Sequence, residues 1–414
     1  MAAPPPPPPE KAPSRTPLSP RLSRIDQVCV VNRPLAWLRC TQDPLLVAGG
    51  LAVGRVPLRV AYKDIGTPED IKLRSGFQRK GSLALRKGPA MNSQGPLHLP
   101  TPLRESLPLS RLAGTSIYLK LDSAQPTGSF KIRGIGHLCK TWAERGCERF
   151  VCCSGGNAGM AAAYSARQLG VPATIVVPSV TPPFTVQKLK DEGATVLIHG
   201  KELKESIEYG QQLVANNAGW VFISPYDDPL IWEGHTSLVR ELEGELEVKP
   251  GAVVLSVGGG GLLCGVVEGL RRAGWGDVPI IAMETVGAHS LNGALEKGEL
   301  ITLPKITSVA TTLGLNRVAA QTLKLAKEHT VFSELVTDQD AVRAVEYFVD
   351  DEKILVEPAC GAALAAVYCN IINRLQKEGK LAKDLGPVVV VVCGGNNISL
   401  AQLQKLKEQL GLSS

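Results

Sequence analysis

The sequence lacks the residue patterns of several common kinds of site. Its ten cysteines form no CxxC pair, and no Cys/His cluster has zinc-site spacing. No apolar run approaches the ~18 residues that a membrane-spanning helix needs. His137, His235 and His289 do not have the spacing of a nucleophile triad. We therefore expect buried free thiols in a reducing compartment and no membrane partner.

The positive net charge does not belong to the main part of the chain. The sequence carries +6, but residues 1–90 hold 15 Lys and Arg against 6 Asp and Glu, a balance of +9 that leaves −3 for the rest. The folded part therefore gives no reason to expect a nucleic-acid partner.

Residues 1–91 are predicted to be a disordered, proline-rich and basic extension. The unbroken run from Pro4 to Pro9 favours polyproline II rather than a packed core. A transit peptide is rich in arginine and poor in acidic residues, and this segment partly meets that description. The proline run argues against an amphipathic targeting helix. We expect this extension to add nothing to the catalytic core.

From Gly95 onward, apolar strands alternate with helices. Continuous apolar strands between helices are typical of buried, mostly parallel α/β sheets, in which ligands bind beyond the carboxyl ends of the strands. A length of 414 residues suits two or three domains. The expected strands are 116–121, 150–153, 173–177, 195–198, 221–223, 253–257, 280–283, 334–337 and 388–392, and the expected helices include 158–169, 203–216 and 230–246.

Lys131 stands where a helix is expected to begin. Pro126 and Gly128 mark a turn, Ser129 is predicted to be the N-cap, and a helical pattern continues to about Arg145. The field of a helix N-terminus disfavours an ammonium and so favours the neutral amine, which can form a Schiff base with a carbonyl cofactor. The alternative is a solvated lysine that happens to follow a cap.

Four consecutive glycines follow the expected strand 253–257 and precede a helix that begins near Leu262. Without Cβ atoms, their backbone N–H groups can converge on an anion such as a phosphate monoester, and the helix N-terminus adds its field. The alternative is a tight turn from strand to helix, and the run does not match GxGxxG. The four residues are Gly258, Gly259, Gly260 and Gly261.

Two more loops follow expected strands. One has a hydroxyl and backbone N–H groups at a helix start, which can hold a carboxylate. The other begins at Cys393. The alternatives are an ordinary helix cap for the first and a buried thiol for the second. The residues of the first loop are Ser154, Gly155, Gly156, Asn157 and Ala158.

The stretch Gln-Pro-Thr-Gly-Ser-Phe-Lys-Ile-Arg-Gly at 125–134 resembles the lysine motif of fold-type II pyridoxal-phosphate (PLP) enzymes. Within them it is most similar to the L-serine dehydratase family. The resemblance extends from about Gly95 to Gly411, and several motifs follow in the family's order, at 151–159, 258–261, 356–363 and 392–397.

The resemblance implies an α/β fold of the tryptophan synthase β type, with two open, mostly parallel sheets flanked by helices. It places a large PLP-binding domain at 92–128 and 226–414 and a small domain at 129–225. The family is typically a cytoplasmic homodimer in amino-acid metabolism and gluconeogenesis.

It also implies roles for matching residues. Lys131 would bind PLP and remove the substrate Cα proton. Phe130 would lie on one face of the ring, with Thr312 near the other, and a neutral Cys393 thiol would face the pyridine nitrogen. The phosphate would lie on Gly258–Leu262 and the substrate carboxylate on residues 154–158, with Asn157 near the cofactor's 3′-oxygen.

A monovalent cation, K⁺, is implied near Glu284. The cage would be completed by the carbonyl groups of Gly258, Ala288, Leu313 and Leu315, since a hard cation prefers oxygen ligands. For Glu284 alone, a salt bridge at the end of a strand is the alternative.

The implied reaction is β-elimination, which converts L-serine to pyruvate and ammonia and L-threonine to 2-oxobutanoate and ammonia. Rivals of the same fold are threonine synthase, cysteine synthase and biosynthetic threonine dehydratase, although no regulatory domain is expected after 403–410. A weakly active or inactive PLP-binding paralogue is a rival of another class. Gly155 and Thr312 motivate it, because the more active serine dehydratases usually have Ala at the first position and family members often have Ala at the second.

Overall fold

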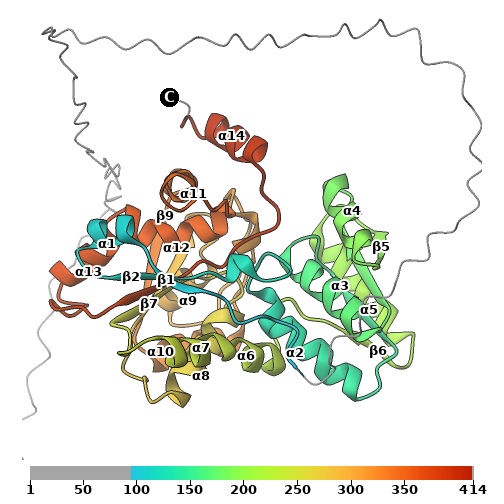
Figure 1. Cartoon of the computed structure of the whole chain (residues 1–414). Helices are drawn as coiled ribbons and strands as arrows, with labels where there is room; N and C mark the ends of the chain where they lie inside the picture. Colours follow the sequence, from blue (N-terminus) through green and yellow to red (C-terminus); the bar gives the residue numbers. More distant parts are fainter. Residues whose placement is uncertain (1–94, 413–414) are drawn as a thin grey trace, which may run out of the picture. The chain divides into compact units, whose positions relative to one another are not determined.

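The computed structural model describes residues 95–412, so the predicted extension at 1–91 lies outside the described residues. The described part contains a six-stranded and a four-stranded sheet (Figure 1). All neighbouring strands are parallel except the first pair of the larger sheet. This arrangement confirms the predicted fold class of two mostly parallel sheets flanked by helices.

The strands of the larger sheet come from widely separated parts of the chain. In spatial order they are β1 (Leu103–Glu105), β2 (Ile117–Lys120), β10 (Val388–Val391), β7 (Ala252–Ser256), β8 (Ile280–Thr285) and β9 (Val331–Val336). The smaller sheet has the order β5 (Thr195–Ile198), β4 (Ala173–Val177), β3 (Arg149–Cys152) and β6 (Trp220–Phe222). The predicted domain limits at 129 and 225 stay a prediction.

The helices that pack around the six-stranded sheet cover both of its faces, with α11 and α12 on one side and α8 and α10 on the other (Figure 1). No helix in residues 95–412 is long and apolar enough to cross a bilayer. The helices are α1 (Leu107–Ala113), α2 (Lys131–Glu144), α3 (Asn157–Leu169), α4 (Pro183–Asp191), α5 (Leu203–Ala215), α6 (Pro229–His235), α7 (Ser237–Glu245), α8 (Gly261–Arg272), α9 (Ser290–Lys297), α10 (Ala320–Glu328), α11 (Asp338–Glu352), α12 (Pro358–Tyr368), α13 (Ile371–Lys377) and α14 (Leu400–Gln409), with short 3₁₀ turns η1 (Asp122–Ala124) and η2 (Thr311–Leu313).

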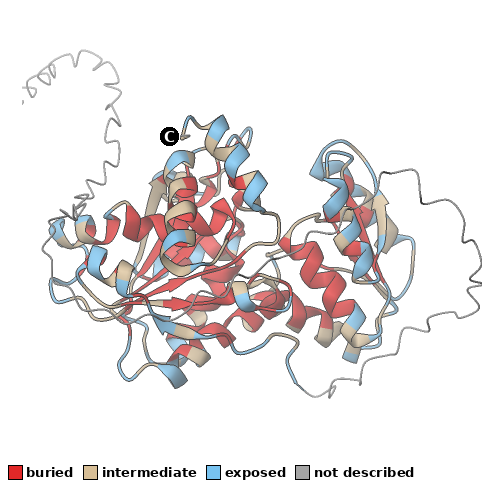
Figure 2. Ribbon diagram, turned by 45° about the horizontal axis from the view of Figure 1, so that its top comes forward, coloured by how far each residue is buried: buried red, intermediate tan, exposed pale blue. Residues whose placement is uncertain are grey.

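The continuous apolar strands are buried as the sequence predicts. Every residue of β7, β8, β10 and β4 is buried, because helices cover these strands (Figure 2). The buried apolar side chains form one large cluster around the six-stranded sheet, a second around α2, α3 and β3, and a small third cluster of Val151, Cys153 and Val176. Each sheet therefore has its own core, and the loops at the strand ends are left to form a site.

The prediction of one helix over 230–246 is wrong in one respect, because the chain forms two helices there, α6 and α7. The Thr236 hydroxyl donates to the Glu233 carbonyl at 2.7 Å, and the Ser237 hydroxyl donates to the Gly234 carbonyl at 2.8 Å. Hydroxyl groups that bond local carbonyls compete with the helical ladder. The Val239 N–H bonds the Thr236 carbonyl in a tighter turn, so α6 ends before α7 begins.

The strand β1 was not predicted. It has three residues, of which two are exposed, and it pairs antiparallel with β2 at the edge of the sheet. A short, mostly exposed edge strand has no apolar run, so its sequence resembles a loop.

Candidate active site

A cavity of about 430 Å³ lies where the loops after β3, β7 and β10 meet. Carboxyl ends of parallel strands gather loops from distant parts of the chain, which explains the convergence. The sequence-predicted residues Glu284 and Ala288 are not in its wall. Those that line it are Phe130, Lys131, Ser154, Gly155, Gly156, Asn157, Ala158, Gly258, Gly259, Gly260, Gly261, Leu262, Thr312, Leu313, Leu315 and Cys393.

Lys131 is the first residue of α2 and so lies in the first turn of this helix, as the sequence predicts. Its Nζ donates a hydrogen bond to the Pro225 carbonyl oxygen at 2.6 Å. Burial disfavours the charged ammonium and lowers the pKa of Lys131 from 10.5 to about 8. A much larger fraction of this amine is therefore neutral near pH 7 than of an ordinary lysine, and a neutral amine is nucleophilic.

The prediction that Ser129 caps this helix is wrong. Phe130 occupies the N-cap position with a helical backbone, and the buried Ser129 hydroxyl has no hydrogen-bond partner within residues 95–412. Ser129 instead pairs with Gly394, and the Phe130 N–H donates to the Cys393 carbonyl at 3.1 Å. The end of β10 therefore fixes the residues before Lys131 in place of a side-chain cap.

Phe130 is half-buried and packs beside a second aromatic ring. Its ring centroid lies 5.2 Å from that of His235, at an interplanar angle of 43°. His235 is fully buried, and burial holds its pKa well below the usual value, so this imidazole is neutral. Neither of its ring nitrogens has a partner in the described part of the chain. The pair fixes the position of the residue that precedes Lys131.

The glycine run forms a tight loop into the N-terminus of α8. A Cβ on Gly259 would lie 2.2 Å from the Tyr226 ring, and one on Gly260 would lie 2.1 Å from Thr322 Cγ2. Gly260 also has a φ of 88°, which L side chains rarely adopt. Within residues 95–412, the backbone N–H groups of Gly258–Gly261 have no hydrogen-bond acceptor. The loop thus presents unused donors beside a helix N-terminus, as an anion site requires.

The loop after β3 enters α3 at Asn157. The Ser154 hydroxyl accepts a hydrogen bond from the Gly156 N–H at 3.1 Å. The two ends of the Asn157 amide are both held, since its Oδ1 accepts from the Asn396 N–H at 3.0 Å while its Nδ2 donates to Glu357 at 3.2 Å. The orientation of this amide is therefore set by the loop after β10 and by Glu357 at the start of α12.

The thiol of Cys393 lines the cavity and is protonated. A hydrogen bond with Cys360, together with burial, holds the pKa of the Cys393 thiol well above its usual value. A neutral thiol cannot pair with a positive charge as an aspartate would.

The sequence reasoning missed Glu357, the acid in the cavity wall. Its side chain is buried, and its Oε2 accepts from the Thr312 hydroxyl at 2.7 Å, while its Oε1 accepts from the Asn397 N–H at 2.7 Å. Burial raises the pKa of Glu357. Glu357 precedes Pro358 at the start of α12, so a Glu-Pro step before an apolar helix was the available sequence feature. Its partners come from three other segments, which no local pattern indicates.

A buried ion cluster under α2 was also missed. Arg133 is fully buried two residues after Lys131, and its Nε donates to Asp122 Oδ2 at 2.7 Å. Its Nη1 donates to Glu241 Oε1 at 2.6 Å. These bonds join the start of α2 to η1 and α7, and so hold Lys131 in place through its own helix.

Glu284 has a role that the sequence did not show. Its two carboxylate oxygens accept the Leu291 and Asn292 N–H groups at 2.9 and 2.7 Å, at the start of α9. Burial raises the pKa of Glu284 to about 8. Among the predicted cage carbonyls, Leu313 lies near Gly258, because a Cβ on Gly258 would be 3.3 Å from the Leu313 carbonyl oxygen.

The fold and the site together define an α/β protein with a cavity at the strand ends, which contains a buried lysine of lowered pKa and a glycine loop with unused N–H donors. A model of the family described as "Pyridoxal-phosphate dependent enzyme" matches residues 95–394. The chain belongs to this family.

Named relatives agree with this assignment. The chain is 67% identical over 323 residues to a mouse (Mus musculus) L-serine dehydratase/L-threonine deaminase, covering 78% of this chain and 99% of the mouse protein. It is 60% identical over 318 residues to a Rattus norvegicus serine dehydratase-like protein, covering 77% and 96%. A solved fungal L-serine ammonia-lyase from Rhizomucor miehei superposes with a TM-score of 0.71 at 37% identity, covering 76% and 99%.

Proposed function

We propose that the protein is a PLP-dependent lyase that deaminates L-serine to pyruvate and ammonia and L-threonine to 2-oxobutanoate and ammonia. The observation that carries this is one cavity that contains both a lysine amine with a pKa of about 8 and four glycines whose N–H groups have no acceptor in residues 95–412. The names of the relatives supply the amino-acid substrates.

The cavity fits the cofactor. Gly258–Gly261 offer donors and no side chains, so they would hold a phosphate at the start of α8. Lys131 would hold the aldehyde carbon, with Phe130 and Cys393 beside the ring and Asn157 near its 3′-oxygen. Bound there, PLP supplies the electron-withdrawing ring that makes the substrate Cα proton acidic.

The chain's own groups would bind the substrate and move its proton. Ser154 and the backbone of residues 155–158 would hold the substrate carboxylate at the start of α3. Lys131 Nζ would take the proton from the substrate Cα, because its lowered pKa suits a base near neutral pH. Glu357 would hold the Asn157 and Thr312 side chains in place through the hydrogen bonds described above.

Three further properties are proposed from the family resemblance. A K⁺ ion would bind Glu284 and the carbonyls of Gly258, Ala288, Leu313 and Leu315, and its charge would favour the ionised Glu284 carboxylate despite burial. The active form would be a homodimer, and the enzyme would act in the cytoplasm.

Pyruvate formation from L-serine by the purified, PLP-loaded chain tests the proposal. We expect pyruvate and ammonia in equal amounts, and 2-oxobutanoate from L-threonine. A protein that binds PLP at Lys131 but releases neither product would instead be a paralogue without useful turnover.

Bonding of PLP to Lys131 is expected to become faster as the pH rises through about 8. The bond requires the neutral amine, and burial lowers the Lys131 pKa to about 8, so about a tenth of the amine is neutral at pH 7. The measurement is the rate at which the cofactor's absorbance band appears after PLP is added to the cofactor-free protein at several pH values. A small lysine derivative, titrated alongside, corrects for PLP's own ionisations. A rate that keeps rising to about pH 10 would contradict the lowered pKa.

Gly155→Ala is expected to raise kcat/KM for L-serine, and to do so most in a Thr181→Ser background. The φ of Gly155 is outside the left-handed region, so alanine is free of backbone strain, and its methyl group narrows the loop's freedom beside the substrate. That methyl carbon would lie 2.9 Å from Thr181 Cγ2, which serine lacks. The measurement is a double-mutant cycle of the two substitutions with equal PLP occupancy. A double variant no faster than Thr181→Ser alone would remove Gly155 as a limit on the rate.

A further inference from the structure

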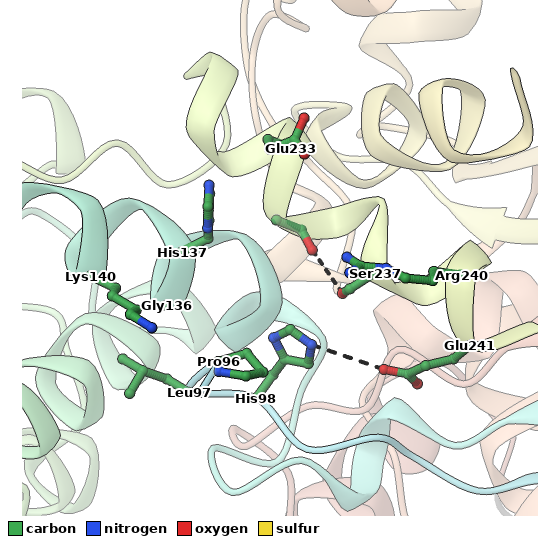
Figure 3. Close-up of a pocket in the computed structure, with 11 residues that line it drawn as sticks. Pro96, Leu97, His98, Gly136, His137, Lys140, Glu233, Ser237, Arg240 and Glu241 are labelled. Atoms are coloured by element: carbon green, nitrogen blue, oxygen red, sulfur yellow. Dashed lines mark hydrogen bonds and ion pairs between the residues drawn. The ribbon is translucent and has the colours of Figure 1, made fainter. Parts of the chain in front are cut away.

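A second cavity, of about 530 Å³, lies outside the candidate active site. The segment 96–98 and the helices α2, α6 and α7 form its wall (Figure 3). It shares no lining residue with the cavity around Lys131. Its volume is within the range of small-molecule sites.

The two carboxylates in this wall already have cations of their own. Glu241 accepts hydrogen bonds from Arg133 Nη1 and Nη2 at 2.6 and 2.8 Å, and Lys120 Nζ lies 2.9 Å from its Oε2. Glu233 accepts two bonds from Arg272, at 2.7 and 2.6 Å. Each carboxylate is therefore already in direct contact with a cation that lies outside the cavity wall.

Arg240 is a lining cation that contacts no carboxylate of the described residues, although its field reaches Glu233. It is exposed and forms no ion pair with a carboxylate of residues 95–412. In Figure 3 its guanidinium lies beside Ser237, and the His98 ring lies below them, turned toward Glu241. An unpaired guanidinium in a hollow is suited to a carboxylate or phosphate group, which it can bind through two parallel hydrogen bonds.

His98 adds a neutral hydrogen-bonding group rather than a second charge. Burial, followed by the charge of Arg133, lowers the pKa of His98 to about 4, and Arg240 acts in the same direction. The field of Arg240 therefore reaches the His98 ring. At neutral pH the uncharged imidazole can contact a ligand's uncharged part beside Pro96 and Leu97.

The cavity is joined to the candidate active site through α2. This helix begins at Lys131 and lines the cavity with Gly136, His137 and Lys140. It packs closely on α6, since a Cβ on Gly234 would lie 2.4 Å from the Arg133 carbonyl oxygen. Because this contact leaves little free space, we expect a shift of the cavity wall to be passed to the start of α2.

We propose that this cavity is a binding site for a small anionic molecule, whose carboxylate or phosphate group pairs with Arg240, and that its occupation alters the surroundings of Lys131. The second half of this proposal rests on the proposed function, since it concerns the cofactor-bearing lysine. The first half concerns binding alone.

Calorimetric titration of the PLP-loaded full chain tests the binding, with benzoate and inorganic phosphate as probes and chloride keeping the ionic strength constant. At least one probe is expected to bind at one site per chain. Its affinity should fall at least about tenfold in Arg240→Gln and stay unchanged in Arg111→Gln, an exposed arginine on α1 outside both cavities. Saturation by benzoate alone indicates a carboxylate ligand, and saturation by phosphate alone indicates a phosphate ester.

Several results would overturn the site. One is that neither probe saturates. Another is that a probe binds Arg240→Gln as tightly as the parent, which would place the bound probe at the loop of residues 154–158 or elsewhere. A third is that the chain self-associates as its concentration is raised and that the affinity for the probe falls at the same time. This would show that a second copy covers this face. Each result is read from binding, so it stands whether or not the chain deaminates serine.

The coupling is tested on the cofactor's absorbance band, which reports on the bond to Lys131. A saturating probe is expected to shift this band in the parent and in Arg111→Gln but not in Arg240→Gln. Saturation without any spectral change would confine the proposal to binding and would contradict its second half.

Discussion

Replacing Lys131 with alanine is expected to reduce pyruvate formation by about 10²–10⁴-fold through loss of the general base alone, and further because the cofactor loses its covalent attachment. The side chain contacts the Pro225 carbonyl and lines the cavity, so its removal changes little of the core. Steady-state kinetics at saturating PLP measure the loss, and circular dichroism checks the fold. Lys324→Ala, at an exposed lysine of α10, is the matched control.

Chemical trapping gives this prediction a second readout. The purified protein is expected to be yellow, and borohydride reduction followed by peptide mapping should locate the cofactor on Lys131. An adduct on another lysine would refute the assignment, as would a Lys131→Ala variant with the kcat of the parent. Lys131→Arg keeps the positive charge without a comparable amine and should be as inactive as the alanine variant.

Gly260→Ala is expected to weaken PLP binding about 10- to 100-fold. Alanine at a φ of 88° is strained, and its methyl carbon would lie 2.1 Å from Thr322 Cγ2, so the loop must move. Forcing a methyl group into a packed site costs roughly 1–3 kcal/mol, and the displaced N–H groups of the loop would no longer converge on the phosphate. Titration of the cofactor-free protein with PLP measures the effect.

Gly274→Ala separates backbone strain from the clash. Gly274 has a φ of 71°, but a Cβ there would meet no atom within 4 Å. It follows α8 and lies outside the cavity. Its variant should lose stability but keep the PLP affinity of the parent. Equal affinities for the two variants would show that the glycine loop does not hold the phosphate.

Local patterns predicted the elements that carry the site. The strands at 173–177 and 195–198 have the predicted bounds, and α3 begins one residue before its predicted start. Strand periodicity and glycine runs depend on neighbours in sequence, so they can be recognised without the fold. The capping of α2 by Ser129 was predicted from the same kind of rule and failed, because pairing with Gly394 determines the backbone there.

The sequence by itself determined a buried parallel α/β framework, the lysine at a helix start and the glycine loop, because each follows from the chemistry of adjacent residues. Only the tertiary structure decided that Glu357 holds Asn157, a residue 200 positions away, and that Arg133 is neutralised by Asp122 and Glu241. The lowered pKa of Lys131 belongs to the second group as well, since burial is its main cause. Burial and long-range pairing arise only when distant segments pack together, and no local pattern records which segments will meet.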